Sequence, residues 1–410
     1  MDPMGNPYAP GAGTSPPELA GRDSILAEAN VTLGRIRAGK SAKSQMLLGL
    51  RGVGKTVLLN RIERMAREHG YHGLLVEAPE DRGLPELLVP PLRKVLLEID
   101  SGEKVRSAAR AAIRALRNFA SAFKVSVGEM ELGFEAARGI ADSGNMESDL
   151  TDLLVAVAEA ARESDTAVAL LIDEVQYLQP RDLAALIVAV HRIGQRGLPL
   201  TIFGAGLPQL AALAGEAKSY AERLFAYPDV GPLSGEAAKD ALREPARRSG
   251  VDYEEDALAV IVRQTRGYPY FLQEWGSHAW LAAERSPITV SDVERATTQA
   301  LAHLDAGFFR VRLDRLSPRE KEYMRAMATL GPGPHRSGDI AGKMGAPVES
   351  VAPIRRNLIS KGMIYSPAHG DTAFTVPMFD EYLVRSMPTA QARSAAPGAT
   401  GRTRDRRRPA

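Results

Sequence analysis

The sequence predicts an α/β fold with three parts: a three-layer α/β/α domain over residues 18–232, a helical lid over 233–305 and a winged helix over 306–388. Three observations lead to this prediction. Apolar runs typical of buried parallel strands alternate with amphipathic helical patterns between residues 45 and 232. From residue 234 onward the pattern is helical only. After residue 317, three helical segments precede two short strand-like segments, which is the element order of a winged helix.

The composition limits the class of protein. The chain has 410 residues, which is too long for a single core, and its 44% hydrophobic and 25% charged content is typical of a soluble globular protein. A formal net charge of only +2 predicts no general affinity for polyanions, so any nucleic-acid contact needs a local basic patch. The absence of cysteine excludes disulfides and thiolate zinc sites. Without a long apolar stretch or a secretion signal, we expect a cytoplasmic protein with no membrane partner.

A glycine-rich motif lies between the first apolar run and the first strongly amphipathic helix of this domain. Glycine lets the backbone curl so that its N–H groups point at phosphate oxygens. The Lys55 ammonium can then reach the β and γ phosphates, and the Thr56 hydroxyl can bind Mg²⁺. The alternative is a glycine turn that matches by chance, which the strand before it and the helix after it disfavour. The candidate phosphate-binding residues are Gly49, Gly52, Val53, Gly54, Lys55 and Thr56.

Two adjacent acids, Asp173 and Glu174, follow the apolar run at residues 167–172. One carboxylate can hold Mg²⁺, and the next can orient or deprotonate an attacking water. We assign Asp173 to the metal and Glu174 to catalysis. A solvated strand end is the alternative, but the phosphate loop upstream favours the catalytic interpretation, and Glu174 favours hydrolysis over binding alone.

Residues 79–146 interrupt the strand–helix alternation and are interpreted as an insertion. They contain helical patterns at 87–99 and 104–119 and a possible hairpin at 123–134. The second helix is basic, and a solvated face is favoured over a DNA contact. The terminal segments 1–17 and 389–410 are rich in proline and glycine, so we expect disorder there, with a basic C-terminal tail.

Helix signals and one arginine complete the expected framework. Capping boxes are expected at Ser291 and Glu294, and at Ser317 and Glu320. Arg223 precedes the expected last strand, where an arginine can stabilise phosphate charge in a neighbouring subunit. A surface ion pair is an alternative of nearly equal weight.

The second of the two adjacent helices of the winged helix, at residues 348–361, is the expected recognition helix. Arginine side chains can read guanine edges or bind phosphates. A winged helix that contacts protein instead of DNA is the alternative. The candidate DNA-binding residues are Ser350, Arg355, Arg356, Asn357 and Lys361.

Together these motifs resemble those of AAA+ P-loop ATPases, of the kind shared by origin-recognition initiators and signal-transduction STAND ATPases. The resemblance covers about residues 18–385. Its motifs are Gly21-Arg22-Asp23, GLRGVGKT at 49–56, LLIDE at 170–174, Arg223, and Gly267-Tyr268-Pro269 in the lid. It implies ATP and Mg²⁺ as cofactors, a lid that senses the nucleotide, Arg22 and Pro269 near the nucleotide, and a homo-oligomer.

Two departures from that family pattern imply slow or conditional hydrolysis. The strand at 198–203 ends in Gly204-Ala205-Gly206, where many AAA+ proteins have an asparagine that positions water, and the lid lacks a Gly-x-x-Arg motif. The resulting hypothesis is a Mg-dependent ATPase that acts as a molecular switch and couples its nucleotide state to double-stranded DNA binding. The alternative is a signalling or scaffold ATPase whose winged helix contacts protein.

Overall fold

The structure is a computed structural model that describes residues 1–11, 13–14, 16–78, 82–100, 106–125 and 140–387. The chain divides into two compact units, the first spanning Met1–Ala302 and the second beginning at His303. None of the helices in the described ranges is long and apolar enough to cross a membrane.

A five-stranded parallel sheet forms the centre of the first unit, with strand order β2-β3-β4-β1-β5. Its strands are β1 Ser44–Leu48, β2 Tyr71–Glu77, β3 Ala167–Asp173, β4 Leu200–Gly206 and β5 Phe225–Ala226. Every residue of β3 and β4 is buried, as expected where helices cover both faces of a parallel sheet. The α/β prediction is therefore confirmed.

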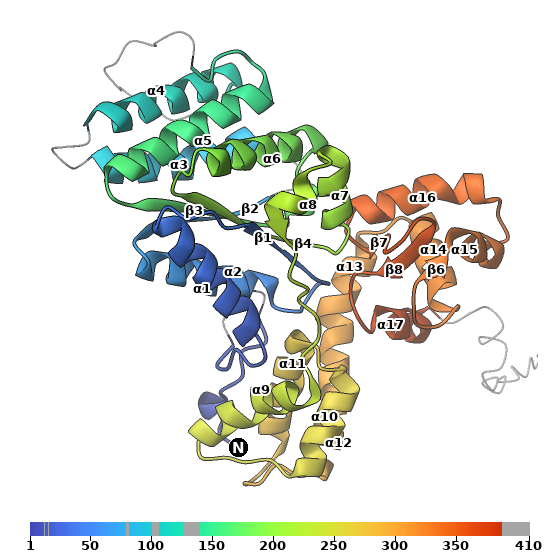
Figure 1. Cartoon of the computed structure of the whole chain (residues 1–410). Helices are drawn as coiled ribbons and strands as arrows, with labels where there is room; N and C mark the ends of the chain where they lie inside the picture. The colour runs from blue at the N-terminus through green and yellow to red at the C-terminus, as the bar shows by residue number, and fades with distance from the viewer. Residues whose placement is uncertain (12, 15, 79–81, 101–105, 126–139, 388–410) are drawn as a thin grey trace, which may run out of the picture. The chain divides into compact units, whose positions relative to one another are not determined.

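Helices cover both faces of the sheet (Figure 1). On one face, Ala169 and Leu171 of β3 share a core cluster with α1 and α2; on the other, Leu170 and Ile172 pack with α5 and α6. The helices of this domain are α1 Asp23–Arg37, α2 Lys55–Glu68, α3 Leu84–Asp100, α4 Arg106–Ala122, α5 Met146–Glu163, η2 Val175–Tyr177, α6 Pro180–Gln195, α7 Leu210–Ala217 and α8 Ala221–Leu224.

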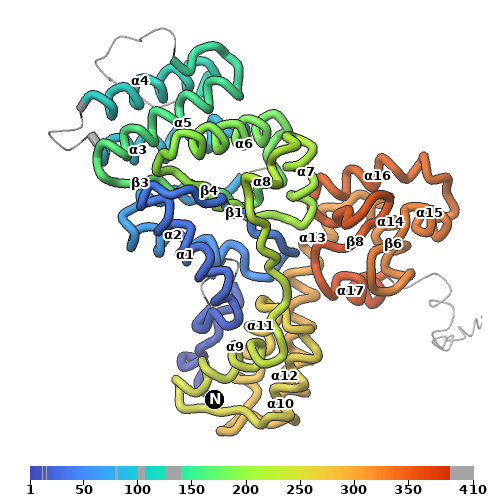
Figure 2. The backbone as a smooth tube through the Cα atoms, viewed as in Figure 1, coloured from blue at the N-terminus to red at the C-terminus, as the bar shows by residue number. Residues whose placement is uncertain are grey.

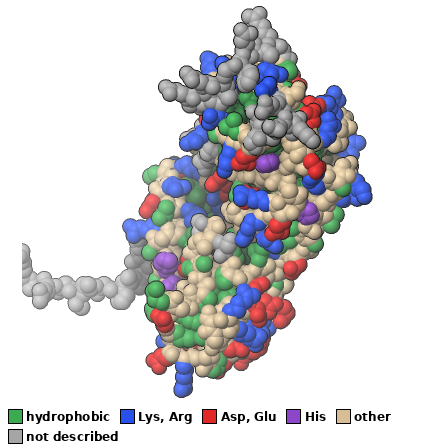
Figure 3. Space-filling view, turned by 90° about the vertical axis from the view of Figure 1, so that its left-hand side faces the viewer, with side chains coloured by type: hydrophobic (Ala, Val, Ile, Leu, Met, Phe, Trp, Pro, Cys, Tyr) green, Lys and Arg blue, Asp and Glu red, His purple; other side chains and the backbone are tan. Residues whose placement is uncertain are grey.

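The segment interpreted as an insertion contributes α3 and α4. α4 packs on α3 and α5, so this segment thickens one helical layer of the domain. Most of the expected hairpin at 123–134 lies outside the described residues, and its first residues, Phe123 and Lys124, form a turn after α4. On the face drawn in Figure 3, basic and acidic side chains are interspersed, which agrees with the small net charge.

The segment predicted to be a lid, which keeps that name here, contains α9 Gly235–Arg248, α10 Glu255–Thr265, α11 Pro269–Ala282 and α12 Val290–His303. The start of α12 differs from the prediction. Thr289 and Asp292, rather than Ser291 and Glu294, form the reciprocal contacts: the Thr289 N–H donates to Asp292 Oδ2 at 2.9 Å, and the Asp292 N–H donates to Thr289 Oγ1 at 3.3 Å. An aspartate in the third helical position serves in place of the expected glutamate because its carboxylate also reaches the cap backbone.

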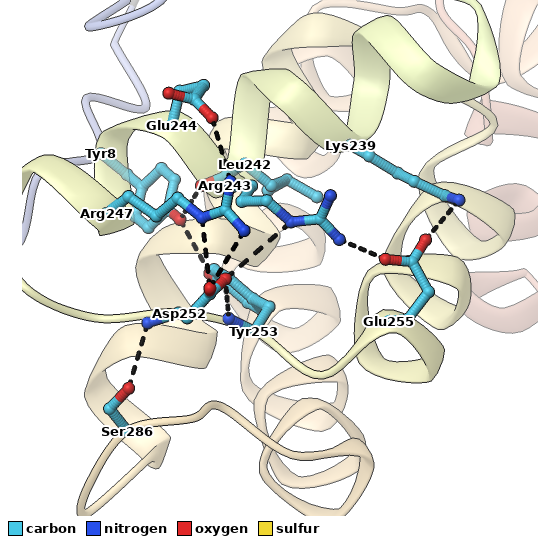
Figure 4. Close-up of polar contacts among 10 residues, drawn as sticks. All are labelled: Tyr8, Lys239, Leu242, Arg243, Glu244, Arg247, Asp252, Tyr253, Glu255 and Ser286. Carbon is cyan, nitrogen blue, oxygen red and sulfur yellow. Dashed lines mark hydrogen bonds and ion pairs between the residues drawn. The ribbon is translucent and has the colours of Figure 1, made fainter.

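Composition predicted disorder over residues 1–17, but residues 1–9 are packed along the lid (Figure 2). They contain the short helix η1 Pro3–Gly5. Tyr8 is 6% exposed; its hydroxyl donates to the Leu242 carbonyl at 2.6 Å and lies 2.8 Å from the Tyr253 hydroxyl (Figure 4). The Trp280 indole also donates to the Asp2 carbonyl at 2.9 Å. Composition averages over residue types and cannot detect a single buried aromatic side chain that anchors a segment.

The second unit contains the three helices and the following hairpin that the sequence predicted, with an additional strand, β6, between the first two helices. Its three-stranded antiparallel sheet has the order β6-β8-β7, and Ser317 and Glu320 form the predicted capping box. The elements are η3 Leu304–Phe309, α13 Arg310–Asp314, α14 Pro318–Ala328, β6 His335–Arg336, α15 Ser337–Met344, α16 Val348–Ser360, β7 Ile364–Tyr365, β8 Asp371–Phe374 and α17 Phe379–Ser386. β6 has no counterpart in the sequence prediction because so short a strand shows no alternation.

Candidate active site

The loop between β1 and α2 needs glycine at three positions. A Cβ atom on Gly49 would lie 2.3 Å from the Val230 carbonyl oxygen, so no side chain fits there. Gly52 and Gly54 have φ values of 84° and 93°, in the left-handed region that side chains disfavour. The backbone therefore forms an open, curled loop at the carboxyl end of β1, which is a suitable cradle for an anion at the start of α2.

Lys55, the first residue of α2, is 6% exposed and points back over this loop. Its ammonium donates to the carbonyls of Gly49 and Leu50, both at 2.9 Å. Burial lowers the pKa of Lys55, and the nearby carboxylates of Glu174 and Asp173 act in the opposite direction. A buried cation bonded to loop carbonyls fits the phosphate-binding group that the loop implies, because phosphate oxygens can replace those carbonyls.

Thr56 and Asp173 meet although they are far apart in the chain. The Thr56 hydroxyl donates to Asp173 Oδ2 at 2.5 Å, and Asp173 Oδ1 accepts from the Glu174 N–H at 2.8 Å. Burial raises the pKa of Asp173, while the Thr56 hydrogen bond lowers it. A hydroxyl beside a carboxylate supplies the oxygen ligands that Mg²⁺ prefers, so this pair fits the implied metal.

Glu174 has a left-handed backbone conformation with φ of 53°, which is uncommon for a residue with a side chain and is concentrated at functional sites. Its Oε1 lies 4.0 Å from Nη1 of Arg51 in the phosphate loop. Its Oε2 accepts a hydrogen bond from Gln176. Arg51 in turn donates to the Tyr177 hydroxyl at 2.5 Å. The carboxylate is thus held between the phosphate loop and the turn after β3.

Arg51, Gln176 and Tyr177 were not among the predicted site residues. Arg51 is inside the phosphate-loop motif, at a position where the motif accepts any residue. Gln176 and Tyr177 closely follow Asp173 and Glu174 in the sequence. Polar side chains so near the acid pair could have identified them as candidate site residues.

Arg22 and the lid both contact the phosphate loop. Arg22 is 7% exposed, and its guanidinium donates to the carbonyls of Val53 at 3.1 Å and Gly231 at 2.6 Å. Burial lowers the pKa of Arg22, and Asp229 opposes that shift. α11 begins at Pro269, and the next N–H, that of Tyr270, donates to the Gly52 carbonyl at 3.2 Å. The structure therefore brings both predicted positions next to the loop.

Arg223 is exposed on the short helix α8, directly before β5. Among the described residues, none forms an ion pair with it, Glu222 included.

Thr201, the polar residue of β4, is buried near the start of that strand, where its hydroxyl lies 3.4 Å from that of Ser44. It therefore does not replace the asparagine that the family pattern places at the carboxyl end.

The five DNA-binding candidates on and after α16 have different environments. Ser350, Arg356 and Asn357 are exposed. The Arg355 guanidinium instead donates to the hydroxyls of Thr372 and Ser366, both at 2.9 Å, and so fastens α16 to the β7–β8 hairpin. The Lys361 ammonium donates to Glu320 Oε2 at 2.8 Å. These contacts give Arg355 and Lys361 a role in holding the second unit together.

Comparison with known proteins agrees with this geometry. Residues 18–203 match the AAA ATPase domain family, residues 306–383 match a domain of unknown function (DUF8462), and no curated protein matches the chain. The Walker-type ATPase PABY2304 of Pyrococcus abyssi has 18% identity and a TM-score of 0.55, covering 89% of this chain and 96% of that chain. Aeropyrum pernix Orc1, solved in complex with DNA, has 16% identity and a TM-score of 0.45, covering 93% of this chain and 96% of that chain. The likeness to the Pyrococcus protein shows a shared fold, and the match to the AAA ATPase domain family covers the phosphate loop and the Asp173–Glu174 pair.

Proposed function

We propose that the chain binds ATP together with Mg²⁺ and hydrolyses it. The observation that carries the proposal is the convergence of three groups at one loop: the buried Lys55 ammonium, the Thr56–Asp173 pair and the Glu174 carboxylate. These are the groups that phosphate binding, metal binding and water activation require. When bound, Mg²⁺ supplies charge neutralisation to the phosphates.

Each residue has a distinct part in this proposal. Lys55 exchanges its carbonyl partners for phosphate oxygens, and the loop N–H groups bind the same oxygens. Thr56 and Asp173 supply oxygen ligands, and because Asp173 is buried, a cation beside it compensates for the lost hydration of its charge. Glu174 orients the attacking water and accepts its proton.

The test is a calorimetric titration of the purified full chain with ATP, with and without Mg²⁺, followed by phosphate release from the same sample. We expect Mg²⁺ to strengthen ATP binding and to be required for phosphate release. No Mg²⁺-dependent affinity for ATP would overturn the proposal.

We further propose that nucleotide binding moves the lid. Two hydrogen bonds support this: Tyr270 N–H to the Gly52 carbonyl, and Arg22 to the Gly231 carbonyl, where the chain enters the lid. A triphosphate that shifts the phosphate loop would change both hydrogen bonds. The lid would then respond to whether the site holds a nucleotide. Arg223, exposed before β5, is our candidate for a contact with the nucleotide of a neighbouring copy in a homo-oligomer.

For the second unit we propose double-stranded DNA binding through the exposed face of α16. Ser350, Arg356 and Asn357 support it, because they share one helix, are exposed, and can bind phosphates or base edges. Arg356→Ala should weaken duplex binding. It should also reduce the slope of log affinity against log salt concentration by the amount expected for about one phosphate contact. The measurement is a gel-shift series over increasing salt concentration.

The matched control is Arg319→Ala, which removes an exposed arginine from α14 and should leave duplex affinity close to that of the wild type. Arg355→Ala is unsuitable because it breaks the link between α16 and the hairpin. If the wild type fails to bind duplex DNA, or if the two variants behave alike, the DNA proposal is wrong.

One observation favours the alternative, a protein partner for this unit. A pocket of about 260 Å³ lies along α16, and one of its lining residues, Val348, is 45% exposed. Its lining residues are Tyr323, Ser337, Val348, Val351, Ala352, Arg355, Arg356 and Ile359. The apolar part of this lining, formed by Val348, Val351, Ala352 and Ile359, fits a protein side chain better than a phosphate backbone. Absence of duplex binding in the gel-shift series would favour this alternative.

A further inference from the structure

We infer that Gln176 is a positioning residue for Glu174 and takes the place of the polar side chain that the end of β4 lacks. The inference rests on the proposed hydrolysis and adds a residue to that site. Gln176 belongs to η2, directly after β3. Its amide nitrogen donates to Glu174 Oε2, and its Oε1 accepts from the Leu207 N–H at 3.1 Å. One side chain thus joins the acid at the end of β3 to the backbone at the end of β4.

The orientation of the Gln176 amide follows from its partners. A carboxylate only accepts hydrogen bonds and a main-chain N–H only donates, so the NH₂ group must face Glu174 and the oxygen must face Leu207. A flipped amide would lose both bonds. Both polar atoms of the Gln176 amide are therefore hydrogen-bonded, and these two bonds hold the side chain in position.

The end of β4 leaves room for this side chain. A Cβ atom on Gly206 would lie 2.6 Å from Gln176 Oε1 and 2.9 Å from Leu210 Cδ2. Because β4 lies between β1 and β3 in the sheet, Gln176 reaches the middle of the carboxyl edge, between the strand that leads to the phosphate loop and the strand that carries the acids. The glycine at position 206 is thus explained by a side chain that enters from η2.

Gln176 affects the direction in which the Glu174 carboxylate points. Gln176 binds one of its oxygens, and Arg51 lies 4.0 Å from the other. Without Gln176, the remaining attraction is toward Arg51 and Lys55, and the carboxylate can turn toward the phosphate loop. A general base must be within hydrogen-bond reach of the water it activates, and a displacement of about 1 Å can cost about 100-fold in rate.

The first experiment compares Gln176→Ala with Gln179→Ala, which removes an exposed glutamine before α6 whose side chain makes no capping contact. We expect Gln176→Ala to lower kcat by about 10- to 100-fold while ATP affinity in calorimetry stays unchanged. Gln179→Ala should match the wild type in both. An unchanged kcat, or a loss explained entirely by weaker ATP binding, would overturn the inference.

A second readout needs neither nucleotide nor turnover. Hydrogen exchange of the Leu207 amide should be faster in Gln176→Ala than in wild-type or Gln179→Ala protein, because its acceptor is gone. Equal protection in all three would contradict the bridge itself.

A double variant shows whether Gln176 acts through Glu174. In single-turnover assays, Gln176→Ala should cause no further loss in a Glu174→Gln background, because the two residues form one unit. A further loss as large as in the wild-type background would show that Gln176 acts independently and would overturn the inference. Failure of the proposed function looks different, since the wild type itself would then release no phosphate.

Discussion

Lys55→Ala should reduce ATP affinity by about 100-fold, which corresponds to about 3 kcal/mol for a charge-assisted contact to phosphate. Lys55 is 6% exposed, and its ammonium already lies over the loop, bonded to the Gly49 and Leu50 carbonyls. Alanine removes the buried positive charge and leaves the phosphate oxygens with the loop N–H groups and Mg²⁺. The measurement is calorimetric titration with Mg-ATP, and circular dichroism of the same sample shows whether the fold is retained.

The matched control is Lys43→Ala, which removes an exposed lysine from the residue before β1. It lowers the net charge by the same amount and should leave ATP affinity unchanged. If Lys55→Ala binds Mg-ATP as tightly as Lys43→Ala, the ammonium does not contact phosphate, and the assignment of the site is wrong.

Glu174→Gln should separate binding from hydrolysis. The amide keeps the size of the carboxylate but cannot accept the proton of the attacking water, so turnover should fall by about 10²- to 10⁴-fold. ATP affinity should remain, because Lys55, Thr56 and Asp173 are unchanged. Phosphate release in single-turnover conditions is the appropriate measurement, since it excludes effects of product release.

Glu77→Gln is the control for this substitution. Glu77 ends β2, is exposed, and lies opposite Asp173 in the register of the sheet, so it is a carboxylate at the same edge on the neighbouring strand. We expect its turnover to match that of the wild type. Equal turnover in Glu174→Gln and Glu77→Gln would show that Glu174 is not the base, even if ATP binding is confirmed.

The sequence by itself determined the sheet domain and the groups of the candidate site. The phosphate loop is a local feature: Gly49 to Thr56 are consecutive, and their conformation follows from glycine geometry and the start of a helix. Asp173 and Glu174 are adjacent and end a buried strand. Because the carboxyl ends of parallel strands lie at one edge of a sheet, their approach to the loop followed from the α/β pattern.

Only the tertiary structure decided which other side chains take part and which are occupied elsewhere. Gln176 reaches Leu207 across the sheet edge, Arg355 is bound by the hairpin, and Tyr8 is anchored on the lid by Leu242 and Tyr253. Each of these contacts joins residues on different elements, and no helical or strand repeat in the sequence relates their positions. Periodicity reports which face of a helix or strand is buried, but a hydrogen bond between two elements depends on their packing, which local sequence does not encode.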